Sequence, residues 1–114
     1  MNKYILLIYS SSESEALWAS YTPDQARSAV QKYVDFAARL RAEGRLVDAE
    51  GLSMIGNTIS RDGIVEGARC MGGIIVGGYY VFTATNLAEA TSIARDCPAL
   101  ENGGTIEVRE QMHY

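Results

Sequence analysis

The fold of this chain is decided by the stretch Gly72-Gly73-Ile74-Ile75-Val76-Gly77-Gly78-Tyr79-Tyr80-Val81-Phe82-Thr83. Its second half is rich in aromatic and β-branched residues, which favour strands. Successive side chains of a strand point to opposite faces. The two faces therefore carry Tyr79, Val81 and Thr83 on one side and Tyr80 and Phe82 on the other. We predict a strand with large side chains on both faces.

Two helices are predicted on either side of this strand. Thr22-Pro23-Asp24-Gln25 combines a capping box with a proline at the first helical position, and Gly44 suits the helix end. The buried stripe of this first helix is expected to hold Ala26, Ala29, Val30, Tyr33, Val34, Ala37 and Leu40. A second capping box opens at Asn86-Leu87-Ala88-Glu89, and Pro98 prevents continuation. Its inward residues are expected to be Leu87, Ala90, Ile93, Ala94 and Cys97.

Further strands are predicted at residues 3–9, from Arg45 to Met54 and over Thr105–Arg109. Asp62-Gly63 between two short apolar runs indicates a small hairpin. Residues 10–21 are polar and predict a loop with a short helical turn around Trp18. The order of elements favours an α+β, ferredoxin-like βαββαβ domain with an extra small hairpin and both helices on one face of an antiparallel sheet.

The other face of this sheet would then be bare. The sheet offers more apolar side chains than two helices can cover, namely Tyr4, Tyr9, Tyr79, Tyr80, Phe82, Ile106 and Val108. A soluble monomer rarely exposes a large apolar patch. We therefore expect the sheet to pack on a second copy through two-fold symmetry, giving a homodimer.

Composition excludes several classes of function. The 114 residues fit a single domain over 1–114, and 14 acidic against 10 scattered basic side chains give a charge of −4, which disfavours nucleic acid. No apolar run is long enough to span a bilayer, and the N-terminus lacks a signal-peptide cleavage site, so no membrane partner is expected. Cys70 and Cys97 form no C-x-x-C pair, which favours a reduced, cytoplasmic protein. With His113 as the only histidine, no metal is expected.

Eight short segments in this order carry a family resemblance: Tyr4-Ile5-Leu6-Leu7-Ile8-Tyr9, the helix with Tyr33, Phe36 and Leu40, Gly44-Arg45-Leu46-Val47, Ala49-Glu50-Gly51-Leu52, Arg61-Asp62-Gly63, Gly77-Gly78-Tyr79-Tyr80-Val81, Cys97-Pro98 and Glu107-Val108-Arg109. Together they resemble the YCII-related proteins, specifically the branch named for its Asp-Gly-Pro-Phe (DGPF) motif. This resemblance implies a dimeric α+β barrel, in which two ferredoxin-like protomers face their sheets inward.

The chain also departs from the family it resembles. The four positions that correspond to the DGPF motif hold Glu66-Gly67-Ala68-Arg69, so the motif is degenerate. The polar stretch that follows the motif in the family is replaced here by small and apolar residues. Some members of the wider family pair a helix histidine with an aspartate before a proline. Those positions fall here on Tyr33 and Cys97, so that pair cannot be assembled.

Glu50 and Tyr33 are the candidate catalytic residues. Glu50 ends a strand expected to border a cleft between the first helix and the sheet, where a carboxylate can act as a base or orient a ligand. An enclosed Tyr33 hydroxyl needs a partner, and Glu50 would supply one. The alternatives are a solvated strand-end carboxylate and a tyrosine that only fills the core.

Tyr9, Glu66, Arg69 and Tyr79 are the expected ligand-binding residues. Arg69 can bind an anionic group or extend its guanidinium into solvent, and Glu66 can pair with it. The glycines of the stretch match no phosphate loop and favour a close approach of strands, so no cofactor is expected.

The leading hypothesis is a cytoplasmic homodimer that binds a small organic molecule in the cleft, with weak acid–base chemistry by Glu50 and Tyr33. The apolar loop 66–76 is expected to border the cleft and to favour a hydrophobic ligand. The alternative is a non-catalytic interaction protein, because Met71–Val76 would suit the addition of a partner strand.

Overall fold

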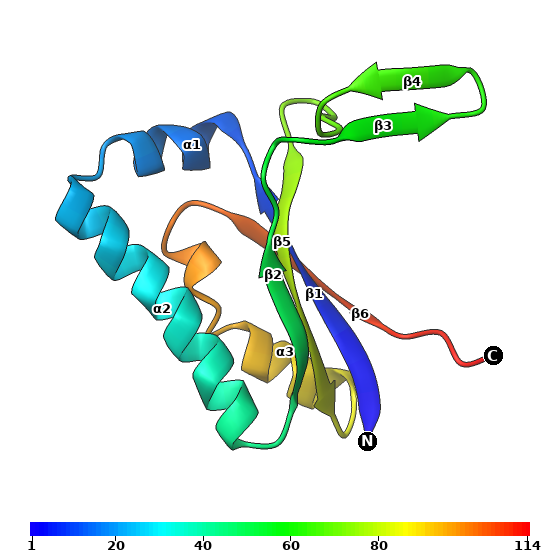
Figure 1. Cartoon of the computed structure of the whole chain (residues 1–114). Coiled ribbons are helices and arrows are strands. Elements are labelled where there is room, and N and C mark those ends of the chain that lie inside the picture. Colours follow the sequence, from blue (N-terminus) through cyan, green and yellow to red (C-terminus); the bar gives the residue numbers. More distant parts are fainter.

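A four-stranded antiparallel sheet, covered by helices on one face, forms the centre of the computed structural model, which describes residues 1–114 (Figure 1). A separate two-stranded hairpin projects from it. In chain order the elements are β1 (Asn2–Ser10), α1 (Ser12–Ala19), α2 (Pro23–Ala42), β2 (Leu46–Gly51), β3 (Asn57–Ser60), β4 (Gly63–Glu66), β5 (Ile75–Ala84), α3 (Leu87–Ala94), a 3-10 turn (Pro98–Leu100) and β6 (Thr105–Glu110).

The sheet has the order β2-β5-β1-β6, and every neighbouring pair is antiparallel. β1 and β2 are therefore parallel to each other with β5 between them, and β5 and β6 are parallel with β1 between them. This is the crossing pattern of a ferredoxin-like domain, so the predicted fold class is confirmed. None of its helices combines the length and the apolar character needed to cross a bilayer.

The hydrophobic core lies between the helices and one face of the sheet. Tyr4 and Leu6 of β1 and Phe82 of β5 are almost completely buried there, against Phe36 and other side chains of the helices. The opposite face of the sheet carries Ile5, Leu7, Tyr9, Tyr79 and Val81, all partly exposed. We call these five residues the open face.

The helices cover more of the sheet than the sequence suggested. Of the seven apolar side chains counted as a surplus, only Tyr9 and Tyr79 lie on the open face. The other five pack on the helix side: Tyr4, Tyr80, Phe82, Ile106 and Val108. Sequence alternation separates the two faces but does not say which of them the helices cover.

The ends of α2 agree with the prediction. The Thr22 hydroxyl accepts from the Gln25 N–H at 3.1 Å, the Gln25 side chain accepts from the Thr22 N–H, and Gly44 adopts a φ of 71°. The buried stripe is narrower than expected, because Val30 and Val34 stay more than half exposed. Both line the cleft described below.

The start of α3 differs from the predicted capping box. Asn86 caps the helix by accepting from the Glu89 N–H, but Glu89 accepts from the Thr85 N–H and from Arg45, each at 2.9 Å. Arg45 lies just before β2 and is partly buried. Its positive charge attracts the Glu89 carboxylate, which therefore does not accept from the Asn86 N–H as a capping box requires. Leu87 is 55% exposed and does not join the core.

Residues 12–19 form a regular helix, where the sequence predicted a loop with one helical turn. Its N-terminus is closed by Ser11 and Ser14, each of which accepts from the backbone N–H of the other. A serine in place of the usual Glu or Gln hides this cap from sequence patterns. The helix carries Trp18 over one end of the cleft.

The predicted hairpin is present, but its two-residue turn is Arg61-Asp62, because Ser60 pairs with Gly63. A second tight turn follows, in which Met71 and Ile74 exchange backbone hydrogen bonds of 3.0 and 3.1 Å. Gly72 and Gly73 have φ values of 60° and 79° there, which L side chains rarely adopt.

The Arg45–Glu89 pair predicts an acid-sensitive link between β2 and α3. The Thr85 N–H and Arg45 lower the pKa of Glu89 from its ordinary value of 4.5. A lowered carboxylate pKa contributes stability above the ordinary value, which is lost as the pH falls through the lowered one. We expect Glu89→Gln to unfold at a lower urea concentration than the wild type at pH 7, with the difference vanishing well below pH 4.5.

The matched control is Glu66→Gln, which alters an exposed carboxylate of β4. It should leave the urea midpoint unchanged at both pH values. A wild-type advantage over Glu89→Gln that persists undiminished at pH 3 would contradict the role given to this pair.

Candidate functional site

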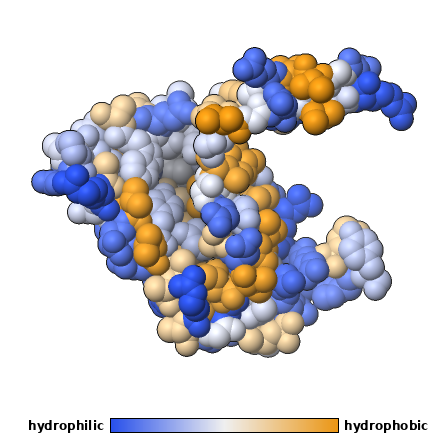
Figure 2. All heavy atoms as spheres, in the orientation of Figure 1, coloured by the Kyte–Doolittle hydropathy of each residue, from blue (hydrophilic) through white to orange (hydrophobic).

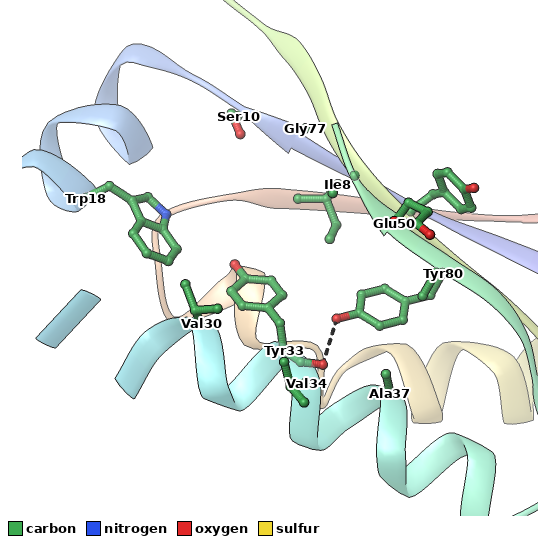
Figure 3. A pocket seen from close by; sticks show the side chains of 14 residues that line it. Ile8, Ser10, Trp18, Val30, Tyr33, Val34, Ala37, Glu50, Gly77 and Tyr80 are labelled. Atoms are coloured by element: carbon green, nitrogen blue, oxygen red, sulfur yellow. Dashed lines mark hydrogen bonds between the residues drawn. The ribbon is translucent and has the colours of Figure 1, made fainter. Parts of the chain in front are cut away.

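A cleft of about 490 Å³ opens between α2 and the helix-side face of the sheet. The surface is hollowed in this region in Figure 2, and the lining side chains are drawn in Figure 3. Val30, Val34 and Ala37 of α2 form one wall, and residues of β1, β2 and β5 form the other: Ile8, Ser10, Ala49, Glu50, Gly51, Gly77, Gly78, Tyr79 and Tyr80. Trp18 and Tyr33 also line it. The cleft is mainly apolar with a few polar groups, which is typical of small-molecule sites.

Two glycines of β5 leave space for this cleft. A Cβ on Gly77 would lie 2.8 Å from the Ser10 hydroxyl oxygen, and one on Gly78 would lie 3.0 Å from the backbone oxygen of Glu50. The predicted close approach of strands at these glycines is therefore confirmed. Because a side chain here would occupy the cleft or press on β2, glycine keeps this end of the cleft open.

Tyr33 presents its hydroxyl at one end of the cleft (Figure 3). This oxygen accepts a hydrogen bond from the Asn102 side-chain amide at 3.3 Å. Its own proton remains free to be donated to a ligand. The backbone carbonyl of Tyr33 accepts from the Tyr80 hydroxyl at 3.1 Å, which ties α2 to β5 across the cleft.

Asn102 holds Tyr33 in place and is only 4% exposed. Besides Tyr33, its amide nitrogen donates to the Pro98 carbonyl at 3.0 Å, and its oxygen accepts from the Tyr21 hydroxyl at 2.6 Å. The hydrogen bonds with Tyr21 and Tyr33 join segments far apart in the chain, and the one to Pro98 closes a turn. Asn102 is not among the site residues predicted from the sequence, because an asparagine before two glycines is typical of an ordinary turn.

Trp18 covers the end of the cleft beside Tyr33. Its ring lies 6.3 Å from the Tyr33 ring, tilted by 31°, and 5.3 Å from Tyr21 in an edge-on arrangement. Such aromatic pairs are held by ring quadrupoles as well as by burial. The sequence predicted only a loop with a short helical turn around Trp18, whereas the structure places this side chain in the cleft lining.

Tyr33 and Tyr80 in the cleft and Cys97 nearby all have raised pKa values. Burial raises the pKa of the Tyr33 hydroxyl, although the Asn102 hydrogen bond opposes the shift. Burial also raises the pKa values of Tyr80 and of the Cys97 thiol. At neutral pH both tyrosines are therefore hydrogen-bond donors, and Cys97 is no nucleophile.

Glu50 does not meet Tyr33 as expected. On β2, Ala49 packs on the core, so the next residue points to the opposite face. Figure 3 shows the Glu50 carboxylate turned away from the Tyr33 hydroxyl, which Asn102 engages instead. Glu50 reaches the cleft at its border, where its backbone oxygen faces Gly78.

The four expected ligand-binding residues are dispersed. Tyr79 borders the cleft, but its hydroxyl donates to Asp48 at 2.8 Å on the open face. Tyr9 donates to Glu107 at 2.7 Å on that same face. Glu66 and Arg69 are exposed, form no ion pair with each other and lie outside the cleft lining.

The loop 66–76 does not border the cleft either. Ile74 instead lines a separate, smaller hollow of about 260 Å³ with Tyr9 and Ser10. The apolar character of the cleft comes from α2 and the strands. Gly72 and Gly73 form a tight turn within this loop, and no residue of the loop lines the cleft.

Tyr33 and Cys97 occupy the two positions where the resemblance places a histidine and an aspartate. They lie close enough that Cys97 contributes to the raised pKa of Tyr33. Cys97 is 2% exposed and its thiol pKa is raised by burial. At pH 7 the Tyr33 hydroxyl and the Cys97 thiol are therefore both protonated and neutral.

Comparison with known proteins places this ferredoxin-like α+β fold in a family. A model of the YCII-related domain matches residues 2–113, and the chain belongs to this family. The assignment to the DGPF branch stays a prediction. No curated protein matches the chain.

One similar solved structure is 5-chloro-2-hydroxyhydroquinone dehydrochlorinase (TftG) from Burkholderia phenoliruptrix AC1100, in complex with 2,5-dihydroxybenzoquinone. The TM-score is 0.55 at 13% identity, with 96% of this chain and 95% of that chain covered. A hydantoinase/carbamoylase family amidase from Burkholderia ambifaria matches with a TM-score of 0.35 at 12% identity, over 97% of this chain and 28% of that one. At these identities, the first likeness shows a shared fold, and the second carries no argument.

The buried position of Asn102 predicts a large effect on stability. Asn102→Ala removes the partner of the Tyr21 and Tyr33 hydroxyls, and leaving buried polar groups unpaired costs about 1–3 kcal/mol. We expect this loss in the free energy of unfolding, measured by urea titration. Asn57→Ala, at an exposed strand residue, is the control and should change it by less than about 0.5 kcal/mol. Equal losses in the two variants would contradict the role of Asn102.

The raised pKa of Tyr33 predicts a loss of stability at alkaline pH. The folded state favours the protonated hydroxyl, so its contribution is present below the ordinary pKa of 10.0 and is lost as the pH rises through the higher folded value. We expect the urea midpoint of the wild type to fall above pH 10 and that of Tyr33→Phe to fall less steeply. Tyr80→Phe should act in the same direction, because burial raises that pKa as well. Parallel declines in the three proteins would contradict this interpretation.

Proposed function

We propose that this protein is a homodimer that binds a small, flat, mainly apolar organic molecule in the cleft, with an oxygen of the ligand accepting a hydrogen bond from Tyr33. The observation that carries the proposal is the lining of the cleft. It combines apolar walls with a hydroxyl whose oxygen is already engaged by Asn102 and whose proton is free.

The apolar walls favour a flat ligand. Val30 and Val34 are 52% and 55% exposed although both lie on the inner side of α2. Ile8 and Ala49 face them from the sheet. Covering such apolar surface stabilises a complex by about 25 cal/mol for each Å² removed from water, before the cost of association.

The charge of the lining disfavours anionic ligands. No lysine or arginine lines the cleft, and Glu50 at its border is the only charged residue among those that line it. A carboxylate or phosphate would lose its hydration without gaining a cationic partner. Ser10, Trp18 and Tyr33 each carry an N–H or O–H donor, whereas the Tyr80 hydroxyl already donates to the Tyr33 carbonyl. A neutral molecule with a carbonyl or ether oxygen fits this set.

The bound molecule in the TftG complex supports the choice of an oxygen-bearing ring as a probe. The enzymatic version of the function, with Glu50 as base and Tyr33 as acid, has less support. It requires the Glu50 carboxylate inside the cleft, and this side chain lies on the opposite face. Binding is therefore the function that we propose, with Tyr33 as the donor that orients the ligand.

The homodimeric part of the proposal is supported by the open face. Its centre carries Ile5, Leu7 and Val81, which the helices leave uncovered. The Tyr9–Glu107 and Tyr79–Asp48 hydrogen bonds border this apolar centre. An apolar patch with a polar rim is the usual anatomy of an interface between protein chains.

We also propose a cytoplasmic location. Cys70 is exposed and Cys97 is buried, and both are free thiols. A free exposed thiol is compatible with a reducing compartment.

Two naphthalene derivatives of matched shape test the ligand class. We expect the neutral ketone 2-acetylnaphthalene to bind, and 2-naphthoate, which carries a carboxylate, to bind at least tenfold more weakly. Isothermal titration calorimetry measures both affinities. Trp18 is the only tryptophan, so a change of its fluorescence would report occupation of the cleft.

Matched variants test the role of Tyr33. Tyr33→Phe removes the donor and should weaken binding of 2-acetylnaphthalene about 2- to 10-fold, the equivalent of one net hydrogen bond. Tyr9→Phe removes a hydroxyl from the open face and should not change the affinity. Gly77→Val places a side chain in the cleft and should abolish binding. Absence of 2-acetylnaphthalene binding, or equal affinities for the two compounds, would overturn the proposed ligand class.

A further inference from the structure

The hairpin formed by β3 and β4, residues 57–66, stands clear of the rest of the molecule (Figure 1). We call it the arm. Its two strands pair only with each other, in a sheet of their own. Figure 1 shows it leaving one end of the main sheet on the side away from α2 and α3, which is the side of the open face.

The arm exposes large apolar side chains. Ile59 and Ile64 are 73% and 68% exposed and lie directly opposite each other, so they form one apolar face. Val65 is 69% exposed on the other face. An isolated two-stranded hairpin is marginally stable in water. These side chains therefore need a surface that this protomer does not supply.

The arm also extends the molecule. A globular chain of this length has a radius of gyration of about 13 Å. The observed value is 15.3 Å, and the extents are 42, 38 and 19 Å. The chain is therefore more extended than a single compact body of this length.

The dimensions of the arm match the thickness of one more sheet. A four-residue strand extends for about 13 Å, and sheets packed face to face lie about 10 Å apart. A sheet stacked on the open face would therefore lie within reach of the arm. The arm and the open face lie on the same side of the sheet, the side away from the helices (Figure 1).

We propose that each arm clasps the second copy of the chain, with Ile59 and Ile64 packed against the flank of the partner sheet. This inference rests on the homodimer of the proposed function and adds the arm to its interface. A second copy fits this surface because it brings an open face of its own, so two-fold symmetry covers both faces and both arms.

The charges agree with a second copy as the occupant. The tip of the arm carries Arg61 and Asp62, one of each sign. The polar rim of the open face carries both signs as well, with Asp48 and Glu107 against Arg109. A surface with both signs can complement its own copy, whereas a surface of one sign would repel it.

Sedimentation equilibrium of matched arm variants tests the clasp. Ile59→Asp places a charge on the apolar face of the arm, and we expect it to raise the dimer dissociation constant at least tenfold. Ser60→Asp adds the same charge on the opposite face of the same strand and should change the constant less than threefold. Circular dichroism should show the same helix content in both variants. Equal constants for Ile59→Asp and the wild type would overturn the clasp.

Leu7→Asp separates the clasp from the dimer itself. This variant charges the centre of the open face and should give a monomer. If the wild type is itself monomeric at all concentrations, the proposed dimer fails and the clasp with it. If Leu7→Asp abolishes the dimer while Ile59→Asp does not affect it, the dimer stands and the clasp fails.

Hydrogen exchange of the wild type supplies a second measurement. The amides of residues 57–66 should be protected at concentrations where the dimer forms, and should exchange freely where it dissociates. Free exchange of the arm within the dimer would assign its apolar face to some other partner and overturn the proposal.

Discussion

The antiparallel pairing of β1 with β5 is the interaction on which the rest of the structure depends. These two central strands run together from Asn2 opposite Ala84 to Ser10 opposite Ile75. Both carry large side chains on both faces, and the single layer of helices covers only one of them. The core, the cleft and the open face all follow from this imbalance, because the covered side chains fill the core and the uncovered ones remain partly exposed.

The cleft forms where the pairing of these strands becomes irregular. The register shifts after Ile8, beside Gly77, and the two glycines leave an opening that side chains elsewhere along β5 fill. Tyr33 and Trp18 cover one end of it, and Asn102 connects that end to the turn before β6. The cleft thus forms where the regular pairing of β1 and β5 is interrupted, and the neutral Tyr33 hydroxyl lies at one end of it.

Much of the fold was predictable because it rests on local patterns. The cap at Thr22, the alternation along residues 79–83 and the turn before Gly63 are each determined by a few neighbouring residues. The site was less predictable because its contacts join distant segments. The sequence around Asn102 predicts a turn, and the sequence around Glu50 predicts a strand end beside the cleft. Neither pattern predicts the direction in which the side chain points.

By itself, the sequence determined the order of the strands and of α2 and α3, the ferredoxin-like crossing of the strands and the presence of surplus apolar surface, because hydrophobic periodicity and capping act over a few residues. Only the tertiary structure decided which face of the sheet the helices cover, that Tyr33 is held by Asn102 and not by Glu50, and that the hairpin extends from the body. These features depend on packing between segments far apart in the chain, such as Tyr33 and Asn102, which are 69 residues apart, and no local pattern encodes such packing.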